Sequence, residues 1–316
     1  MNILSQFLTL FASGSFWQLA LRDAALLALP ALGGVISERS GVTNIAMEGM
    51  MLTGAFFSVV AALTLHNPWA ATLVAMLAGG LMALIHAVIS IRYRADQIIS
   101  GFAINIAAVG LTTFLNAKFS GFHGLPQIAP GERLPTLTFP MLSNIPFFGQ
   151  VLFQQNIMVY VALILLAVVN VVLFRTRLGL RVRAVGEHPE AADTAGVNVY
   201  NLRYGAVIMS GLLSGLAGAF LALGIAYIFN DNLTGGRGYI ALAAMIFGKW
   251  SPWGAFVACM IFGMGDALAA STGLLSVPQY FLQMVPYLLV LIVLAGVVGR
   301  STPPAADGVP YSPGED

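Results

Sequence analysis

The stretch VLFQQNIMVYVALILLAVVNVVLFRTRLGLRVR, residues 151–183, decides the class of fold. Its first part, 151–174, contains no charged side chain, and four arginines follow within the next nine positions. An α-helix needs about 20 mostly apolar residues to cross the hydrocarbon core of a bilayer. Arginines in a short loop mark the cytoplasmic side. The stretch therefore predicts a helix that crosses a membrane and emerges in the cytoplasm.

The composition of the whole chain extends this prediction. Of the 316 residues, 58% are apolar and only 9% are charged, and the mean hydropathy is +0.86. An ordinary soluble domain carries about 25% charged residues, so this chain could not cover a surface exposed to water. Besides 151–174, membrane spans are predicted at 16–36, 69–91, 97–117, 204–225 and 278–298.

Two further apolar regions are less regular. Residues 43–65 carry Glu48 near their start, and residues 238–271 are too long for one span. The sequence GKWSPWG at 248–254 divides the second region and leaves GYIALAAMIF as a short first piece. We therefore predict an all-α, polytopic membrane bundle of about 8–10 transmembrane helices.

Basic residues predict which loops face the cytoplasm. Residues 175–203 contain five of the fourteen basic residues, the loop 91–96 contains two arginines, and Arg300 follows the last span. All three segments are predicted to be cytoplasmic. The loop 118–150 contains five prolines and few charges and is predicted to be external.

The ends of the chain follow from these assignments. The transmembrane domain is predicted to cover residues 1–300, and the Pro-rich, acidic tail 301–316 is predicted to be disordered. The N-terminal MNILSQFLTLF lacks the basic start of a signal peptide and reads as a retained interfacial helix. Five spans before Arg175 would place the N-terminus outside. A broken segment 43–65 that crosses twice would place it inside, and we favour this version.

The two halves of the chain show a weak internal repeat. GVTNIAMEGMML (41–52) and GGRGYIALAAMIF (235–247) align through an Ile-Ala pair, and each lies between Gly/Ala-rich spans. The spacing of small residues in GLLSGLAG (211–218) favours close helix packing. We predict two similar halves with interrupted helices, the arrangement by which transporters build a pathway near the bilayer midplane.

A charged passage, EHPEAADTAG (187–196), interrupts the apolar sequence. Pro189 suits a first helical turn, the acidic residues beside it favour the helix dipole, and Gly196 suits a C-terminal stop. The passage predicts a short cytoplasmic helix over 187–195. It is either a solvated connection between two spans or a helix that docks into a groove of a soluble partner.

Its sequence resembles a known family. EAADTAG has the Glu-Ala-Ala-x-x-x-Gly pattern of the cytoplasmic loop in permease subunits of bacterial ABC importers. The Ile-x-Leu-Pro that often follows in other importers is absent, which fits the class that imports simple sugars, nucleosides or branched-chain amino acids. Similarity to the nucleoside and simple-sugar permeases extends over nearly the whole chain outside 118–150 and the tail. The stretches that carry it are LGGVISERSGVTNIAMEGMMLTGAF (32–56), ADQIISGFAINIAAVGLTTFL (95–115) and GRGYIALAAMIFGKWSPWGAF (236–256).

The resemblance implies a membrane-spanning permease in the bacterial inner membrane, coupled to a separate ATPase and nearest the purine-nucleoside importers. It implies that the 187–196 helix contacts the ATPase through Glu187, Pro189, Glu190, Ala191, Ala192 and Gly196. It also implies an extracytoplasmic substrate-binding protein and a second permease, either a paralogue or a second copy. ATP and Mg²⁺ would bind to the partner ATPase, and this chain would bind no cofactor.

The chain shows no enzyme site. It has no Gly-x-x-x-x-Gly-Lys-Ser/Thr phosphate loop, since Trp250 follows the lysine of FGKW. The four histidines are scattered, and the single cysteine, Cys259, excludes an internal disulfide and disfavours a metal cluster. The net charge of +1 makes nucleic acid an unsuitable partner, whereas membrane lipid surrounds the chain.

Polar and aromatic residues within the spans are the candidates for a substrate pathway, because polar groups are costly in lipid and usually face the bundle interior. They are Asn44, Glu48, Phe102, Asn105 and Tyr239. Each also has a structural interpretation: the amides and the carboxylate could hold helices together, and the aromatic rings could be packing.

The substrate remains open at this stage. A nucleoside is uncharged and needs only amides, hydroxyls and aromatic rings, which agrees with the low charge within the spans. A simple sugar or a branched-chain amino acid is the alternative within the same class, although a zwitterion would favour opposite partial charges. A remoter alternative is an ion-coupled secondary transporter with Glu48 or Asp266 as its coupling carboxylate, and a membrane scaffold is remoter still.

Overall fold

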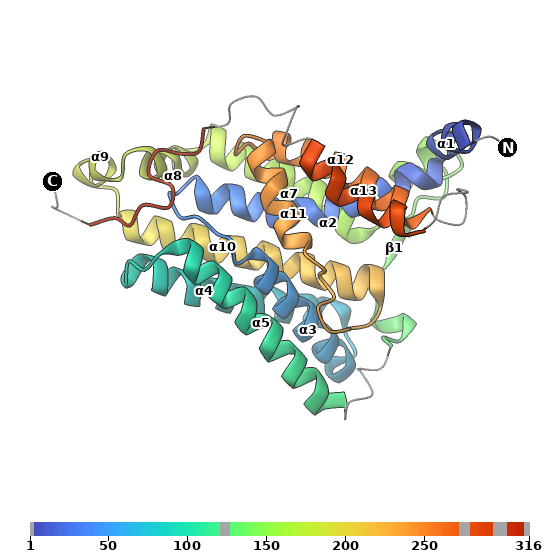
Figure 1. Ribbon diagram of the computed structural model, residues 1–316, viewed down its shortest axis with the longest axis horizontal. Coiled ribbons are helices and arrows are strands. Elements are labelled where there is room, and N and C mark those ends of the chain that lie inside the picture. The colour runs from blue at the N-terminus through green and yellow to red at the C-terminus, as the bar shows by residue number, and fades with distance from the viewer. Residues whose placement is uncertain (1–2, 121–126, 272–278, 293–301, 313–316) are drawn as a thin grey trace.

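The computed structural model describes residues 3–120, 127–271, 279–292 and 302–312, and this part of the chain is an all-α bundle with one small sheet (Figure 1). The α-helices are α1 (Ile3–Ala12), α2 (Gly14–Glu38), α3 (Met47–Leu65), α4 (Pro68–Ala87), α5 (Gln97–Ser120), α6 (Phe148–Phe153), α7 (Ile157–Arg175), α8 (Arg177–Glu187), α9 (Pro189–Thr194), α10 (Val199–Ala219), α11 (Arg237–Phe247), α12 (Pro252–Ala270) and α13 (Gln279–Ile292). The π-helical turns η1 (Val88–Arg92) and η3 (Phe220–Ala226) continue α4 and α10, and η2 (Pro130–Glu132) is a 3-10 turn. Strand β1 (Thr136–Thr138) pairs antiparallel with β2 (Gln154–Asn156), with Thr136 opposite Asn156.

Seven described helices are long and apolar enough to cross a membrane, namely α2, α3, α4 with η1, α5, α7, α10 with η3, and α12. The predicted spans at 16–36, 69–91, 97–117, 151–174 and 204–225 are confirmed. Helix α13 occupies the described part of the predicted span 278–298, and residues 278 and 293–298 lie outside the described residues, as does Arg300. The polytopic all-α prediction is therefore correct.

The prediction that 43–65 crosses the membrane twice is wrong. Helix α3 is one continuous helix of 19 residues, and the chain before it is non-helical from 42 to 44. Five membrane-length helices thus precede Arg175. This odd number agrees with the alternative of five spans before Arg175, which predicts that the N-terminus lies on the side opposite α8 and α9. Figure 1 agrees, because α1 and the α8–α9 pair lie at opposite ends of the bundle.

The division of 238–271 is confirmed. Helix α11 has 11 residues and ends at a tight corner, after which α12 turns back along the bundle. Lys249 and Trp250 have φ values of 55° and 51° there. Gly248 has no room for a side chain, since a Cβ atom would lie 2.1 Å from the backbone nitrogen of Ala255. This close approach lets the short helix reverse direction.

Small residues bring α10 against α3 and α4, as the sequence predicts. A Cβ atom at Gly215 would lie 2.3 Å from the carbonyl oxygen of Ala75, and one at Gly218 would lie 2.2 Å from that of Met51. Backbones that approach this closely gain dispersion contacts in lipid, where the hydrophobic effect between helices is absent. The centre of the bundle is therefore rigidly packed.

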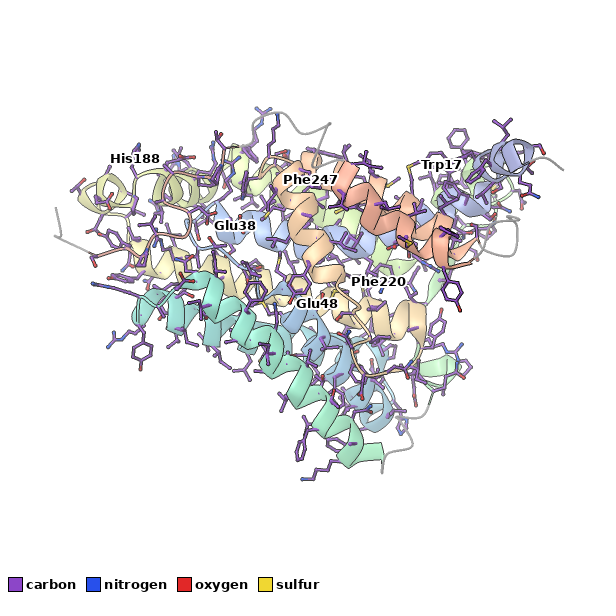
Figure 2. The ribbon with its side chains drawn as sticks, viewed as in Figure 1. Trp17, Glu38, Glu48, His188, Phe220 and Phe247 are labelled. Atoms are coloured by element: carbon purple, nitrogen blue, oxygen red, sulfur yellow. The ribbon has the colours of Figure 1, made fainter. Side chains whose placement is uncertain are left out.

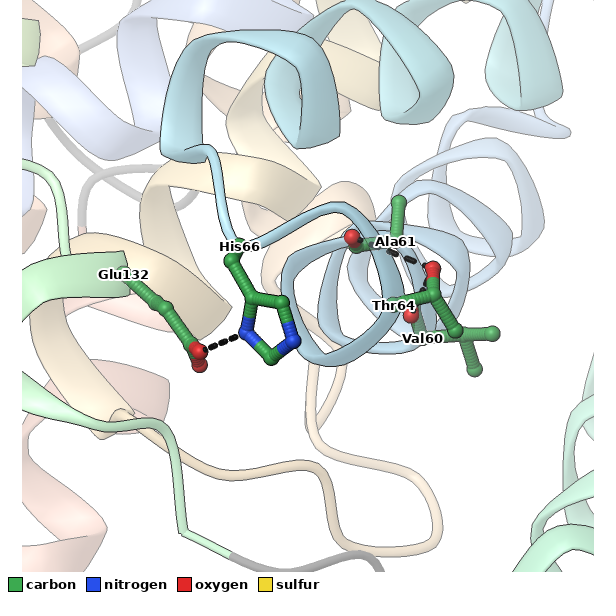
Figure 3. A network of polar contacts seen from close by, with 5 residues as sticks. All are labelled: Val60, Ala61, Thr64, His66 and Glu132. Atoms are coloured by element: carbon green, nitrogen blue, oxygen red, sulfur yellow. Dashed lines mark hydrogen bonds and ion pairs between the residues drawn. The ribbon is translucent and has the colours of Figure 1, made fainter.

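The predicted external loop lies at the end of the bundle opposite α8 and α9. It contains η2, the β1–β2 pair and α6, and residues 121–126 are outside the described part. The side chain of Asn156 caps α7 by accepting a hydrogen bond from the backbone N–H of Met158 (3.0 Å). The helix therefore begins at 157 instead of the predicted 151. Figure 3 shows a further contact at this end, between Nδ1 of His66 and Oε1 of Glu132 (2.5 Å).

The tail differs from its prediction. Composition predicts a disordered segment over 301–316, but residues 302–312 lie against the end of the bundle that carries α8 and α9 (Figure 1). Ala306 and Tyr311 are buried there, and the backbone N–H of Ala306 donates to the carbonyl of Gly186 (2.9 Å). Composition missed this because a few specific contacts can order a polar segment that has no core of its own.

Candidate functional site

The N-terminus of α3 is held near the middle of the bundle by a buried segment, residues 39–46. Within it, Asn44 is fully buried. Its Nδ2 donates to Oγ of Ser210 (2.9 Å), and its Oδ1 accepts from the backbone N–H of Ala46 (3.1 Å). These bonds tie the segment to α10. Asn44 is thus placed within the helix packing and does not line the cavity described below.

Glu48, in the first turn of α3, binds the N-terminus of α11. Its Oε1 accepts hydrogen bonds from the Thr234 hydroxyl (2.5 Å) and the Gly236 backbone N–H (2.9 Å), and its Oε2 accepts from the Gly238 N–H (2.6 Å). An acid at a helix N-terminus satisfies the free N–H groups and complements the helix dipole. Gly238 permits the contact, since a Cβ atom there would lie 2.5 Å from Cα of Glu48. Figure 2 shows Glu48 near the centre of the bundle.

Asn105 of α5 connects both of these helices. Its Oδ1 accepts from the backbone N–H of Gly49 (2.8 Å), and its Nδ2 donates to the carbonyl of Ile45 (3.0 Å) and to the hydroxyl of Tyr239 (2.9 Å). Both amide hydrogens are therefore used within the protein. Asn105 fixes the orientation of the Tyr239 hydroxyl, which accepts one hydrogen bond and retains its own proton for another partner.

A cavity of about 580 Å³ lies beside this network, between α3, α5 and α11. Four of the five predicted pathway residues line it, namely Glu48, Phe102, Asn105 and Tyr239. The volume is in the range of pockets that hold small organic molecules, about 300–1,000 Å³. The structure thus gathers around one cavity polar and aromatic side chains that are far apart in sequence.

The two aromatic rings are the most accessible of these groups. Phe102 is 49% exposed and Tyr239 is 39% exposed. The cavity opens along α5, whose neighbouring Ile106 is 74% exposed. In the described part of the chain, no other helix covers this face of α5. The accessible apolar edge beside the cavity is available to a flat ligand or to another membrane-embedded helix.

The charged passage 187–196 contains α9, so the predicted short helix is confirmed with the narrower bounds Pro189–Thr194, and Glu187 is the last residue of α8. His188 separates the two helices, because its backbone is extended (φ −144°, ψ 83°). Pro189 occupies the first turn of α9, and Gly196 ends the passage with a φ of 80°, as predicted. Figure 2 shows His188 at the end of the molecule opposite Trp17.

The predicted contact residues of this passage divide into two groups. Glu187, Glu190, Ala191 and Gly196 are exposed, whereas Pro189 and Ala192 are buried. Ala192 is 5% exposed and packs in a small apolar cluster with Val185, Val199 and Tyr311. One face of α9 is therefore packed against the rest of the chain, and the other face is exposed.

Comparison with known proteins identifies the chain at the family level. The family model for the permease component of branched-chain amino acid transport systems matches residues 18–294. The chain belongs to this family. It is therefore a transport component of an ABC system and a multi-pass protein of the bacterial inner membrane.

Curated relatives of this permease cover most of its length. The guanosine ABC transporter permease protein NupQ of Bacillus subtilis is 44% identical over 92% of this chain and 94% of the relative. The nucleoside ABC transporter permease protein NupC of Lactococcus lactis is 42% identical over 89% and 91% of the two chains. The glucose ABC transporter permease protein TsgC13 of Haloferax volcanii is 38% identical over 82% and 77%.

A solved structure shows the same fold as the permease. An inward-facing metal-chelate type ABC transporter aligns with a TM-score of 0.50, covering 88% of this chain and 85% of that chain. The sequence identity is 16%, so the likeness concerns the fold alone. It supports the polytopic bundle and says nothing about what this permease carries.

Sequence reasoning missed the partners of Glu48 in the permease. Thr234, Gly236 and Gly238 lie 186 to 190 positions away from it. A signal was present in TGGRGY, because a threonine and three glycines before a short helix favour exposed N–H groups. The sequence did not show which acid would reach them.

Proposed function

We propose that this permease carries a nucleoside through the cavity between α3, α5 and α11. The observation that carries the proposal is that the carboxylate of Glu48 already accepts three hydrogen bonds from within the protein. Among the described residues that line the cavity, Glu48 is the only charged one. The cavity therefore offers amide, hydroxyl and aromatic groups, which suit an uncharged solute better than a zwitterion.

The relatives support the same substrate class. Two permeases whose names refer to guanosine and to nucleosides share 44% and 42% of their residues with this chain over most of its length. The permease TsgC13, which is named for glucose, shares 38%. Nucleoside transport is accordingly proposed ahead of sugar transport.

Phe102 and Tyr239 would contact the base. Both are partly exposed in the cavity, and aromatic rings stack favourably on flat heterocycles. The Tyr239 hydroxyl accepts from Nδ2 of Asn105, so its proton points to another acceptor, such as an oxygen of the base or ribose. Glu48 and Asn105 would hold the helices that present these rings.

The energy would come from a separate ATPase, which would hold ATP and Mg²⁺. The exposed residues Glu187, Glu190, Ala191 and Gly196 would contact this ATPase, with Pro189 and Ala192 holding α9 in place. A second permease, a paralogue or another copy of this chain, would cover the exposed face of α5 beside the cavity. A substrate-binding protein would dock on the outer loops.

Transport by the complete assembly tests this proposal. The permease would be co-purified with its ATPase and second permease, reconstituted into liposomes, and supplied with its binding protein. ATP-dependent uptake of labelled guanosine is expected, with much slower uptake of glucose and leucine. Preferred uptake of glucose or leucine would contradict the nucleoside assignment. Uptake driven by a proton gradient without ATP would contradict the coupling.

Variants of Tyr239 test the cavity itself. Tyr239→Phe removes the hydroxyl but keeps the ring, and we expect KM for guanosine uptake to rise by about three- to tenfold, the value of one hydrogen bond. Tyr239→Ala should cost more, because the stacking surface is also lost. Tyr280→Phe is a matched control, since Tyr280 is 81% exposed on α13. Equal kinetics in all three variants would exclude Tyr239 from the pathway.

A variant of α9 tests the coupling. Glu190→Lys reverses an exposed charge, and we expect ATP-driven uptake to fall while the amount of protein in the membrane stays unchanged. Glu190→Gln, which keeps the size of the side chain, should have a smaller effect. A thiol at position 190, in a Cys259→Ala background, should react with an impermeant reagent only from the cytoplasmic side. Reaction from outside would overturn the assignment of α9.

A further inference from the structure

The C-terminal segment 302–312, here called the strap, connects two parts of the permease that the proposed function treats separately. Ala306 and Tyr311 are buried, whereas Val309 is 54% exposed. The strap contains two hydrogen-bonded turns, from the N–H of Asp307 to the carbonyl of Pro304 (3.1 Å) and from the N–H of Val309 to that of Ala306 (3.3 Å). It is thus a defined structure and not a loose end.

One end of the strap contacts the coupling passage. Tyr311 is 5% exposed and packs with Ala192 of α9 and Val185 of α8. Its ring lies 5.6 Å from that of Tyr200, at the start of α10. Tyr311 therefore supports the inner face of α9, opposite the face that is open to the cytoplasm.

The middle of the strap contacts the end of α8. The backbone N–H of Ala306 donates to the carbonyl of Gly186 (2.9 Å), and that of Ala305 donates to Oε2 of Glu187 (3.2 Å). Gly186 itself fits closely against the carbonyl of Arg39, since a Cβ atom there would lie 2.3 Å from that oxygen. The strap and α8 thus meet the start of the segment 39–46 together.

The strap also holds this segment directly. Oδ1 of Asp307 accepts a hydrogen bond from the hydroxyl of Thr43 (3.0 Å). Gly41 lies between the strap and Arg203, because a Cβ atom at Gly41 would lie 3.0 Å from the carbonyl of Ala306 and 2.8 Å from Nη2 of Arg203. Thr43 precedes the first turn of α3, where Glu48 binds α11 beside the cavity.

Arg203 of α10 holds the strap by a hydrogen bond. It is 1% exposed, its Nη1 donates to the carbonyl of Val309 (3.0 Å), and its guanidinium carbon lies 6.0 Å from the centre of the Tyr311 ring. A buried guanidinium that binds a strap carbonyl fixes the position of the strap on α10, because breaking such a contact leaves a buried charge without its acceptor. The strap cannot shift without moving the groups on both sides of it.

We propose that Tyr311 and Asp307 are positioning residues for coupling, and that the strap transmits movement of α9 to the segment 39–46 and hence to the cavity. The proposal rests on the assignment of α9 to the ATPase. The strap links Ala192 to Thr43 through a short series of contacts.

Two strap contacts in series give a sharp test. Tyr311→Ala removes the contact with α9, and Asp307→Ala removes the contact with Thr43. In the reconstituted transporter, each variant should lower guanosine uptake per ATP hydrolysed by about tenfold, a typical coupling effect between two sites. Since either break interrupts the same series, the double variant should be no worse than the single ones. Independent contacts would instead add.

Controls separate transmission from simple stabilisation. Tyr311→Phe keeps the ring and should restore coupling, and Val309→Ala changes an exposed strap side chain but leaves its backbone carbonyl on Arg203. The yield and thermal stability of the assembled transporter are measured for every variant. Uptake that falls only in proportion to assembled protein, additive losses, or an unchanged ratio of uptake to hydrolysis would each overturn the proposal.

A second readout separates failure of the strap proposal from failure of the nucleoside assignment. If the wild-type transporter does not carry guanosine, stimulation of ATP hydrolysis by the substrate-binding protein still reports the coupling through α9. Stimulation that is reduced in Tyr311→Ala and Asp307→Ala but equal to the wild type in Val309→Ala would then support transmission through the strap, even though the nucleoside assignment had failed. Unaltered stimulation in all three variants would count against the strap alone.

Discussion

Residues 39–46 lead into α3, and residues 227–236 lead into α11. These two lead-ins meet at the carboxylate of Glu48 but differ in their surroundings. Residues 39–46 are largely buried, and Ser40, Val42 and Asn44 are fully so. The segment before α11 is largely accessible, because Asn230, Asp231 and Gly235 are exposed. The segment before α3 is held by the helices, the strap and α8. The segment before α11 is held at Glu48, by the hydrogen bond from Asn116 to Asp231 (2.9 Å) and by the buried ring of Phe229.

This difference indicates how the cavity can be rigid on one side and adaptable on the other. The buried lead-in transmits movement from the cytoplasm, because its neighbours leave it no independent freedom. The exposed lead-in makes few buried contacts, which is typical of segments that open at low cost. Movement of α11 relative to α3 would change the cavity at the side of Tyr239.

The largest effect is expected where the two lead-ins meet. Glu48→Ala leaves three donors without their acceptor, the hydroxyl of Thr234 and the N–H groups of Gly236 and Gly238. Each unsatisfied buried donor costs about 1–3 kcal/mol, so we expect the purified protein to unfold at a clearly lower temperature. Thr234→Val removes a single donor and should cost less. A Glu48→Ala variant as stable as the wild type would show that this junction does not hold α11.

A matched pair of asparagines compares the two lead-ins directly. Asn44→Ala removes two buried hydrogen bonds, to Ser210 and Ala46, and should lower the unfolding free energy by about 2 kcal/mol. Asn230→Ala changes an exposed side chain of the other lead-in, and its cost should stay within about 0.5 kcal/mol. Thermal unfolding of both variants in the same detergent gives the comparison. Equal losses would show that burial does not distinguish the lead-ins.

Docking of the strap on residues 39–46 is expected to depend on pH. Burial raises the pKa of the Asp307 carboxyl from 3.8 to about 6, against the hydrogen bonds from Thr43 and the Gly308 backbone, which lower it. Arg203 and the carboxyl of Glu38 also face Asp307. Because the pKa is higher in the docked state, docking is strongest below about pH 4 and weakens as the pH rises through about 6.

Fluorescence anisotropy of a dye at residue 312, in a Cys259→Ala background, measures this docking. The anisotropy should fall between pH 5 and pH 7 as the strap loosens. Asp307→Asn keeps an oxygen for Thr43 but does not titrate, and it should flatten the curve. A fall of the same size in Asp307→Asn would assign the dependence to another group.

The smallest effect is expected at the outer end of the bundle. His66 is exposed, and its contact with Glu132 joins the end of α3 to η2 of the predicted external loop (Figure 3). Contacts of this kind at the surface contribute about 0–1 kcal/mol. Glu132→Gln should therefore change the unfolding temperature little, far less than Asn44→Ala. A large loss would show that the outer end is as firmly held as the cytoplasmic one.

The sequence predicted the site in part, for a physical reason. Glu48, Phe102, Asn105 and Tyr239, which the sequence predicts for the pathway, line one cavity, and their role in transport stays a prediction. Asn44 is also a polar residue in an apolar stretch, but its side-chain amide is hydrogen-bonded to Ser210 and Ala46. Composition cannot separate an amide that faces a cavity from one that joins two helices.

The sequence alone determined the membrane class, most of the spans and the short helix that begins at Pro189, whereas the cytoplasmic position of the arginine-rich loop stays a prediction. These properties depend on local composition and on the thickness of a bilayer, which act on each segment separately. Tertiary structure decided that α3 is unbroken, that Glu48 caps α11, and that the tail docks beside α9. Those outcomes depend on hydrogen bonds and packing between residues far apart in the chain. The local pattern of apolar residues does not show which distant residues come into contact.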